Sequence, residues 1–204
     1  MTNTDELTLA SLLVSRLMHD LAASAGAVSN GVEMLKEEGS DAGAIELLEF
    51  SAAETVRRLE FFRLAFGAAG GLGVRQPLDE ARAKTHAFFE GRRVRIEWPT
   101  GAIADAPQPV VKLILNLVLL GAEALPKGGT VTVAVGDRLL AVIAAGSAAA
   151  LTDEKKSALS GTPGALNARL VQPYYAGALA RALQTTVACE EMPDRLALSV
   201  ALAG

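Results

Sequence analysis

The chain has 204 residues, half of them hydrophobic, so it is long enough for one large domain or two small ones with a packed core. Its net charge of −4 argues against a nucleic-acid-binding surface, which needs an excess of lysine and arginine. No apolar run reaches the roughly 18 residues that cross a bilayer, and the acidic start is unlike a secretory signal. The lone Cys189 cannot form an internal disulfide. We therefore expect a soluble cytoplasmic protein without nucleic-acid or membrane partners.

Two long segments with helical periodicity open the chain, at residues 7–36 and 44–66. In the second segment, Glu54 and Arg58 stand at the i,i+4 spacing of a helical ion pair. The turn between the segments, residues 37–43, is short and contains glycine and serine, so the two helices should pack antiparallel. A lone helical hairpin cannot cover both of its apolar faces. We therefore predict that two copies pair into a homodimer with a four-helix bundle.

A glycine-rich stretch, residues 67–73, divides the chain into a hairpin domain (1–70) and a second domain (74–204). In the second domain the sequence predicts helices over 78–89, 110–125 and 166–183, and Pro173 should start or kink the last of these. It predicts strands over 93–98, 130–135, 139–144, 185–190 and 195–201. Residues 99–109 should form a loop, and residues 153–164 a loop or short helix. Helices on one face of a mixed, mostly antiparallel sheet form an α/β sandwich, so the predicted fold class is α+β.

The first predicted helix has two contrasting faces when its residues are placed at about 100° intervals. The apolar face suits burial in a bundle, whereas the opposite face carries one histidine among small residues and an amide. A histidine held off the core in this way is accessible to a partner. The two faces comprise Leu13, Leu17, Leu21, Val28 and Leu35 on one side, and His19, Ala23, Gly26 and Asn30 on the other.

The histidine-bearing face resembles the phosphoacceptor helix of the ChpT-like histidine phosphotransferase family. That helix reads roughly His-Asp-Leu, a few small residues, Gly-Ala, then Asn-Gly and an apolar pair. One departure is Ser24, where relatives often have proline. The order of a helical hairpin and an α/β sandwich is also that of sensor histidine kinases. The residues that carry the resemblance are His19-Asp20-Leu21, Gly26-Ala27, Asn30-Gly31 and Met34-Leu35.

The second domain resembles a kinase ATP-binding domain that has lost its nucleotide chemistry. Kinases carry Asn-x-x-x-Asn-Ala before a Gly-Gly turn, and the second Asn helps to hold Mg²⁺. Here Leu120 follows Asn116 at that spacing, and an apolar side chain cannot ligate Mg²⁺. Where kinases read adenine with Asp-x-Gly-x-Gly, residues 144–148 read Ala-Ala-Gly-Ser-Ala. We therefore expect a scaffold that binds no cofactor of its own and is not an ATP-dependent kinase.

The resemblance implies that His19 relays a phosphoryl group between aspartates of receiver domains in a two-component phosphorelay. The donor would be the receiver of a hybrid histidine kinase, and the acceptors would be response regulators. A neutral imidazole is a good nucleophile, and the receiver supplies its own Mg²⁺. Asn30 lies about 16 Å along the helix from His19, too far for direct catalysis. The implied roles are phosphoacceptor for His19, support for Asp20, phosphoryl contact for Arg16, and partner binding for Ala23, Gly26 and Asn30.

Three alternatives compete with the relay. A true histidine kinase would need the nucleotide-binding residues that this chain lacks, and an HD-type phosphohydrolase would need more than its two histidines. A non-catalytic dimeric adaptor related to histidine kinases is harder to exclude, because a scaffold could keep everything except a working His19. Among the other polar residues, we interpret His86 as surface or linker and Cys189 as buried in a strand. We interpret Arg92, Arg93 and Arg95 as a solvated strand edge, with contact to an acidic partner as the alternative.

Overall fold

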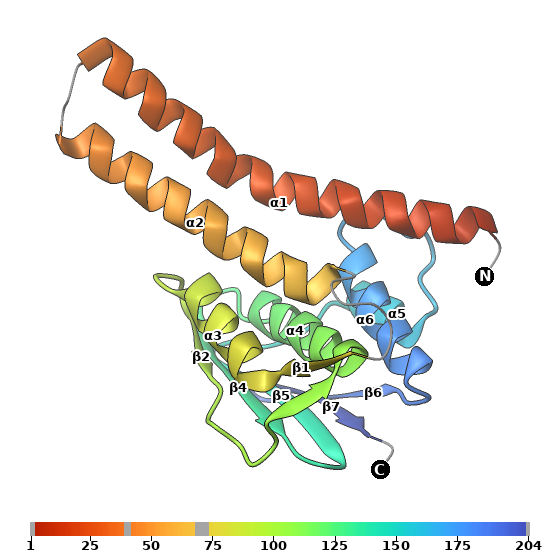
Figure 1. Ribbon diagram of the computed structural model, residues 1–204. Helices are drawn as coiled ribbons and strands as arrows, with labels where there is room; N and C mark the ends of the chain where they lie inside the picture. Colours follow the sequence, from red (N-terminus) through yellow and green to blue (C-terminus); the bar gives the residue numbers. More distant parts are fainter. Residues whose placement is uncertain (1–2, 39–41, 68–73, 203–204) are drawn as a thin grey trace.

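The computed structural model describes residues 3–38, 42–67 and 74–202 (Figure 1). Helices α1 (Asn3–Glu38) and α2 (Ala42–Phe66) pack against each other as an antiparallel hairpin that lies across one side of the rest of the chain. This confirms the predicted helical hairpin. Residues 39–41 of the predicted turn and 68–73 of the predicted domain boundary lie outside the described residues, so the division into domains stays a prediction.

The remaining elements build an α/β sandwich beneath the hairpin (Figure 1). In chain order they are β1 (Arg75–Pro77), α3 (Leu78–Phe89), β2 (Val94–Glu97), β3 (Asp105–Pro107), α4 (Gln108–Glu123), β4 (Gly129–Val135), β5 (Leu139–Ala145), α5 (Asp153–Ser160), α6 (Val171–Ala182), β6 (Val187–Met192) and β7 (Arg195–Ala201). Across the described ranges, no helix is long and apolar enough to span a bilayer.

The main sheet has five strands in the order β2-β4-β5-β7-β6. Strands β2 and β4 are parallel, with Ile96 opposite Val131, and the other neighbours are antiparallel. Alternate residues of the central strands β5 and β7 are buried, as expected when one face of a sheet is covered and the other is solvated. The predicted α+β fold, with a mixed and mostly antiparallel sheet, is confirmed.

Helix α4 is the centre of the core, because it contacts β4 and β5 on one side and α2 and α6 on the other. Its apolar residues point in every direction, which is the pattern of a helix that is buried all round. A side chain at Gly121 would lie 3.3 Å from Cγ1 of Val142, so glycine lets α4 approach the sheet closely. Leu113, Ile114, Leu115, Leu117, Val118 and Leu120 are all fully buried there.

Two expectations for the second half are wrong in detail. Residues 99–109 are not all loop, because β3 pairs antiparallel with β1 and places Gln76 opposite Ala106. Helix α6 begins at Val171 rather than near residue 166. Just before it, Oδ1 of Asn167 accepts hydrogen bonds from two following backbone amides and holds a turn. Pro173 then lies in the first helical turn, where a missing N–H costs little.

Candidate functional site

His19 lies near the middle of α1 with 87% of its side chain exposed. Its Nδ1 is 3.4 Å from Oδ1 of Asp20, the only side-chain contact that the described residues make with the ring. When Nδ1 carries the proton and faces that carboxylate, the lone pair of the imidazole is on Nε2. The ring is therefore oriented at one nitrogen and accessible at the other.

Asp20 is held in turn by an ion-pair chain that joins the hairpin to the second domain. Nε of Arg16 donates to Oδ2 of Asp20 at 2.9 Å, and Nη2 of Arg16 donates to Oε1 of Glu123 on α4 at 2.7 Å. Nζ of Lys155 on α5 donates to the other oxygen of Glu123 at 2.6 Å. Burial opposes the charge of Arg16, but its bonds to Asp20 and Glu123 outweigh it and raise the pKa of Arg16. Arg16 is thus already engaged by two carboxylates, and its contact with a phosphoryl group stays a prediction.

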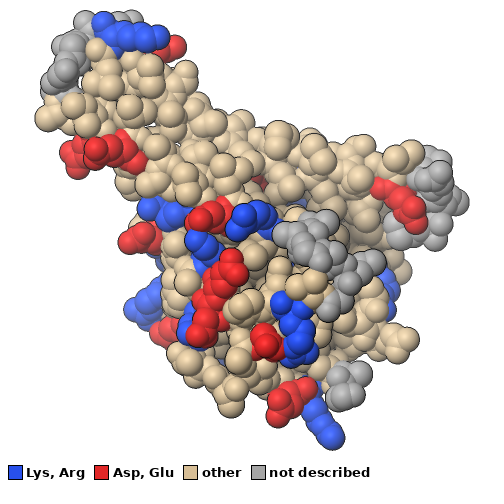
Figure 2. Space-filling view, in the orientation of Figure 1, with Lys and Arg blue, Asp and Glu red and all other residues tan. Residues whose placement is uncertain are grey.

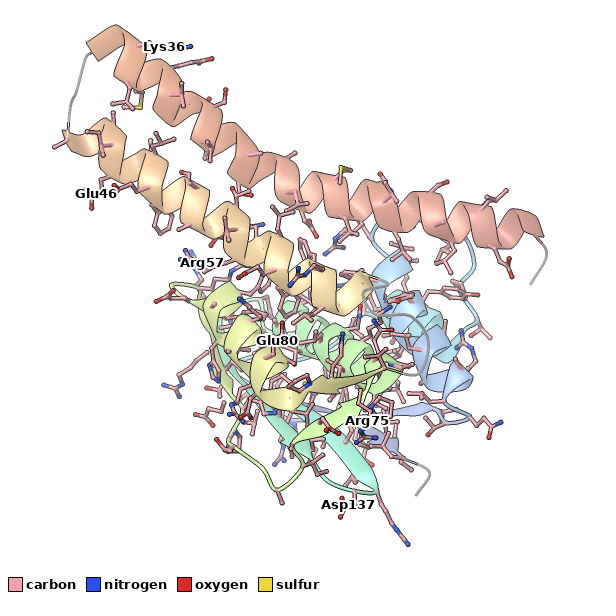
Figure 3. The ribbon with its side chains drawn as sticks, viewed as in Figure 1. Lys36, Glu46, Arg57, Arg75, Glu80 and Asp137 are labelled. Atoms are coloured by element: carbon pink, nitrogen blue, oxygen red, sulfur yellow. The ribbon has the colours of Figure 1, made fainter. Side chains whose placement is uncertain are left out.

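A second cationic group approaches the same turn of α1 from α2. Nη1 of Arg58 donates to the backbone oxygen of Asp20 at 2.9 Å, and Nε of Arg58 donates to Glu54 at 2.8 Å. The predicted pair between Glu54 and Arg58 is therefore confirmed. Arg57 and Arg92 also contact the Glu54 carboxylate, at 3.4 and 3.0 Å. Figure 3 shows Arg57 on the side of α2 that faces the α3–β2 turn. Three guanidinium groups thus share one carboxylate beside the histidine.

The prediction that Arg92 belongs to a solvated strand edge is wrong. Its guanidinium lies 4.0 Å from the centre of the Phe88 ring and bonds Glu54, so the side chain is half-buried at the contact with the hairpin. Burial and the neighbouring charge of Arg58 lower the pKa of Arg92. Arg93 and Arg95 are exposed, as expected. Cys189 is half-buried on β6, and burial raises the pKa of its thiol.

The three predicted partner-binding residues, Ala23, Gly26 and Asn30, are exposed along α1 on the same face as His19. Two glycines of this helix differ in the space that surrounds them. A side chain at Gly31 would lie 3.2 Å from Cβ of Leu48 on α2, so glycine is needed there for helix packing. A side chain at Gly26 would have no atom within 4 Å. Packing within the chain does not account for glycine at position 26.

Ser24, at the position where relatives often have proline, is buried against α2. Its Oγ donates to the backbone oxygen of Leu21 at 3.0 Å, and α1 continues through this point without a break. A serine hydroxyl that bonds back to the preceding turn is a common way to accommodate this residue inside a helix.

A shallow groove of about 440 Å³ adjoins the His19 face, between the hairpin and the α3–β2 turn. Ala23 and Ala27 of α1 form one wall, Phe50 of α2 contributes an aromatic ring that is 64% exposed, and Gly91 and Arg92 border the second domain. Charged side chains gather where α2 meets α3, whereas the visible surface of α1 is largely uncharged (Figure 2). This groove could not be predicted from the sequence, because its walls come from three distant segments.

Asn116 and Leu120, the two residues compared above with the kinase motif, take part in packing within the chain. Nδ2 of Asn116 donates to the backbone oxygen of Ala65 at the end of α2 and to that of Lys112. Its Oδ1 accepts from Nε2 of Gln172 on α6 at 3.0 Å, and Leu120 is fully buried. Asn116 therefore joins the hairpin, α4 and α6. Within the described residues, no three His, Cys, Asp or Glu side chains gather closely enough to hold a metal ion.

Known proteins are similar to this chain in both sequence and fold. The family described as "Histidine phosphotransferase C-terminal domain" matches residues 78–195. The protein phosphotransferase ChpT of Brucella abortus (strain 2308) is 40% identical over 127 residues, which span 62% of this chain and 60% of that protein. The match therefore covers less than two thirds of the length of this relative.

Among solved structures, a bacterial phosphotransferase superposes with a TM-score of 0.83 and 31% identity, over 98% of this chain and 97% of that one. The histidine kinase ThkA, solved in complex with the response regulator protein TrrA, gives a TM-score of 0.51 with 12% identity, over 98% of this chain and 63% of that one. This second likeness concerns the fold alone. The chain belongs to the histidine phosphotransferase family, and the resemblance inferred from residues 16–35 is confirmed.

Proposed function

We propose that the protein is a histidine phosphotransferase that carries a phosphoryl group on His19 between receiver-domain aspartates of a two-component phosphorelay. The observation that carries this proposal is the state of His19, which is almost fully exposed while its Nδ1 faces Asp20. A histidine that was buried, or hydrogen-bonded through both nitrogens, could not attack the phosphoryl group of a partner. Membership of the histidine phosphotransferase family supports the same activity.

The chemistry needs little from this chain beyond orientation. Nε2 of His19 attacks the phosphorus of an aspartyl phosphate, an N–P bond forms, the O–P bond breaks, and the receiver's aspartate leaves as a carboxylate. The second transfer is the reverse step onto another receiver. Asp20 faces the Nδ1 proton and stabilises the positive charge that the ring gains during attack. The Mg²⁺ ion at the reacting phosphoryl group belongs to the receiver, so we propose no cofactor for this chain.

We propose that the receiver docks on the His19 face and in the adjoining groove. Ala23 and Gly26 leave this face without large side chains. Glycine inside a helix costs about 1 kcal/mol relative to alanine, and packing within the chain gives no reason for glycine at position 26. Phe50 offers an exposed aromatic anchor of the type that dominates protein interfaces. The side chain of Asn30, exposed further along α1, makes no hydrogen bond with any described residue and is available to the partner. Gly91 and Arg92 let the second domain share in the docking.

We also propose that the chain acts as a homodimer in the cytoplasm. A stripe of exposed apolar residues runs along both hairpin helices, on a side of α1 away from His19. On α1 its members recur at the spacing that produces a seam between paired helices. Burying this stripe in a second copy leaves both His19 faces free. The stripe comprises Leu7, Val14, Met18 and Val32 on α1, and Ile45, Val56 and Leu59 on α2.

Transfer of labelled phosphate from a phosphorylated receiver to the full-length chain tests the proposal, and the chain supplies its own matched control. It has two histidines, both exposed on helices, at positions 19 and 86. The His19→Ala variant should take up no label, and the His86→Ala variant should behave as the wild type. A wild-type chain that accepts no label from any receiver but binds receivers through the hairpin would instead be the non-catalytic adaptor.

A further inference from the structure

A cavity of about 310 Å³ lies between the hairpin and the second domain, on the Asp20 side of α1. Helices α1, α2 and α4, the end of α3 with the turn that follows it, and the start of α6 contribute its walls. Asp20 lines this cavity and His19 does not, so the cavity is separate from the face where phosphotransfer is proposed. Its size is at the lower end of the range for small-molecule sites.

The cavity wall carries more positive than negative charge. Four arginines line it, against the two carboxylates of Asp20 and Glu123. Arg58 and Arg92 share Glu54 with Arg57, which also pairs with Glu90, and Arg93 makes no ion pair with any residue of the described ranges. Burial lowers the pKa of Arg92, and the neighbouring charge of Arg58 adds to this shift. Planar guanidinium groups that converge in this way match the oxygens of a phosphate group.

The rest of the wall is apolar and aromatic. Phe62 and Phe66 of α2 line the cavity beside Leu119 of α4. Phe88 contacts the ring of Phe62, and the guanidinium of Arg92 lies over Phe88, 4.0 Å from its centre. These surfaces suit a ring, because an aromatic face packs well against both phenylalanine and arginine. The combination therefore favours a ligand with an anionic head and a flat apolar body.

One buried polar atom on the wall has no partner. Gln172 is only 2% exposed, and its Nε2 donates to the backbone oxygen and to Oδ1 of Asn116, at 2.8 and 3.0 Å. These two bonds fix the amide, so its Oε1 is left as an acceptor to which no described residue donates. A buried acceptor without a donor is costly and rare in native proteins. An N–H or O–H group of a ligand in the cavity would satisfy it.

We propose that this interdomain cavity binds a small aromatic phosphomonoester. The phosphate lies against Arg58, Arg92 and Arg93, and the ring packs on Phe62 and Phe66. A donor group on the ring reaches Oε1 of Gln172. Because Arg16 and Arg58 also hold the carboxylate and the backbone of Asp20, the bound ligand lies one side chain away from the residue that orients His19. This site is additional to the proposed phosphotransfer and does not depend on it.

Calorimetric titration of the full-length protein tests the proposal with four probes. Phenyl phosphate should bind saturably, 4-aminophenyl phosphate should bind more tightly because its amine donates to Gln172, and inorganic phosphate should bind at least tenfold more weakly. Benzyl alcohol, which has the ring without the charge, should not bind. The proposal is overturned if neither aromatic phosphate binds at millimolar concentration. It is equally overturned if inorganic phosphate binds as tightly as they do.

Three variants locate the ligand. Ala122→Leu fills the cavity from α4 and should abolish binding. Arg93→Ala removes an unpaired guanidinium and should weaken binding about tenfold, because one charge-assisted hydrogen bond is lost. Arg95→Ala is the matched control, because Arg95 is an exposed arginine on β2 that does not line the cavity. Circular dichroism checks that each variant is folded. Wild-type binding by folded Ala122→Leu, or equal weakening by Arg95→Ala and Arg93→Ala, would place the ligand elsewhere.

Discussion

The hairpin and the second domain bury their apolar residues in opposite ways. Helix α4 is covered on all sides by the sheet, α2 and α6. Helix α1, among the residues whose side chains are described, fully buries only Ser24 and Gly31, and it leaves an apolar stripe exposed. The core of the second domain is thus closed by α2 of the hairpin, whereas the hairpin itself has two unfinished surfaces. One suits a second copy of the chain, and the other, around His19, suits a transient partner.

The largest effect expected from this contrast concerns the apolar stripe. Leu59 on α2 and Leu139 on β5 are similarly exposed, at 50% and 55%, but only Leu59 belongs to the stripe. Leu59→Arg should dissociate the dimer, because each copy loses the burial of a leucine, about 1.5–3 kcal/mol, and gains an unpaired charge. With two copies per dimer, the dissociation constant should rise by roughly 10²–10⁴.

Light scattering at micromolar concentration measures the mass of both variants. Leu139→Arg should remain a dimer, because it changes the same side chain at a similar exposure outside the stripe. A wild-type monomer with a folded hairpin would contradict the account of the hairpin, and so would a dimer that survives in Leu59→Arg.

The next effect concerns the polar junction where the two regions meet. Asn116→Leu should lower the free energy of unfolding by about 2–4 kcal/mol, because it removes the side-chain donor to the Ala65 carbonyl and one of the two acceptors of the buried Gln172 amide. Asn30→Ala, on the exposed face of α1, should change stability by less than about 0.5 kcal/mol and should slow phosphotransfer without abolishing it. Urea unfolding distinguishes the two variants. Equal stabilities would mean that Asn116 does not join the regions.

Periodicity predicted the hairpin, the buried α4 and the exposed position of His19, because each depends on residues that are near in sequence. It missed β1 and β3, whose three residues each include a proline and carry no alternating pattern. It also missed the exposed position of Phe50 in the groove and the contacts of Arg92. The contact of Arg92 with Glu54 joins residues 38 apart, and only the packing of the hairpin on the second domain brings them together.

A smaller effect on the free energy of unfolding, one that depends on pH, is expected at the cluster of arginines around Glu54. Burial favours the protonated form of Glu54, but Arg58 and Arg92 outweigh it and hold the pKa of that carboxyl below its usual value of 4.5. Its contribution to stability is therefore complete above about pH 4.5 and is lost as the pH falls through the lowered folded-state value. Glu54→Gln should cost about 1–3 kcal/mol at pH 7, since three cations lose their shared anion.

Thermal unfolding between pH 3 and pH 7 measures this difference. The loss of stability on acidification should be smaller in Glu54→Gln than in the wild type, so the two curves should converge at low pH. Curves that stay parallel over the whole range would show that Glu54 does not anchor the cluster.

The smallest stability effect is expected at Gly26, and Gly31 on the same helix provides the contrast. Gly26→Ala should stabilise the protein by up to about 1 kcal/mol, because alanine favours the helix and the added methyl group meets no atom. Gly26→Leu should leave the fold intact and slow transfer from a receiver. Gly31→Leu should destabilise the hairpin by about 1–3 kcal/mol through overpacking against Leu48. A Gly26→Leu variant with wild-type transfer would remove this residue from the docking surface.

The most direct test of the central claim is an NMR spectrum of the protein labelled with ¹⁵N-histidine, before and after phosphorylation by a receiver. The chain gives only two imidazole spin systems, from His19 and His86, so the acceptor and the substituted nitrogen can both be identified. We predict that the His19 signals alone shift and that the phosphoryl group is on Nε2, because Nδ1 faces Asp20. A phosphorylated protein in which His19 is unchanged, or substituted at Nδ1, would contradict this account.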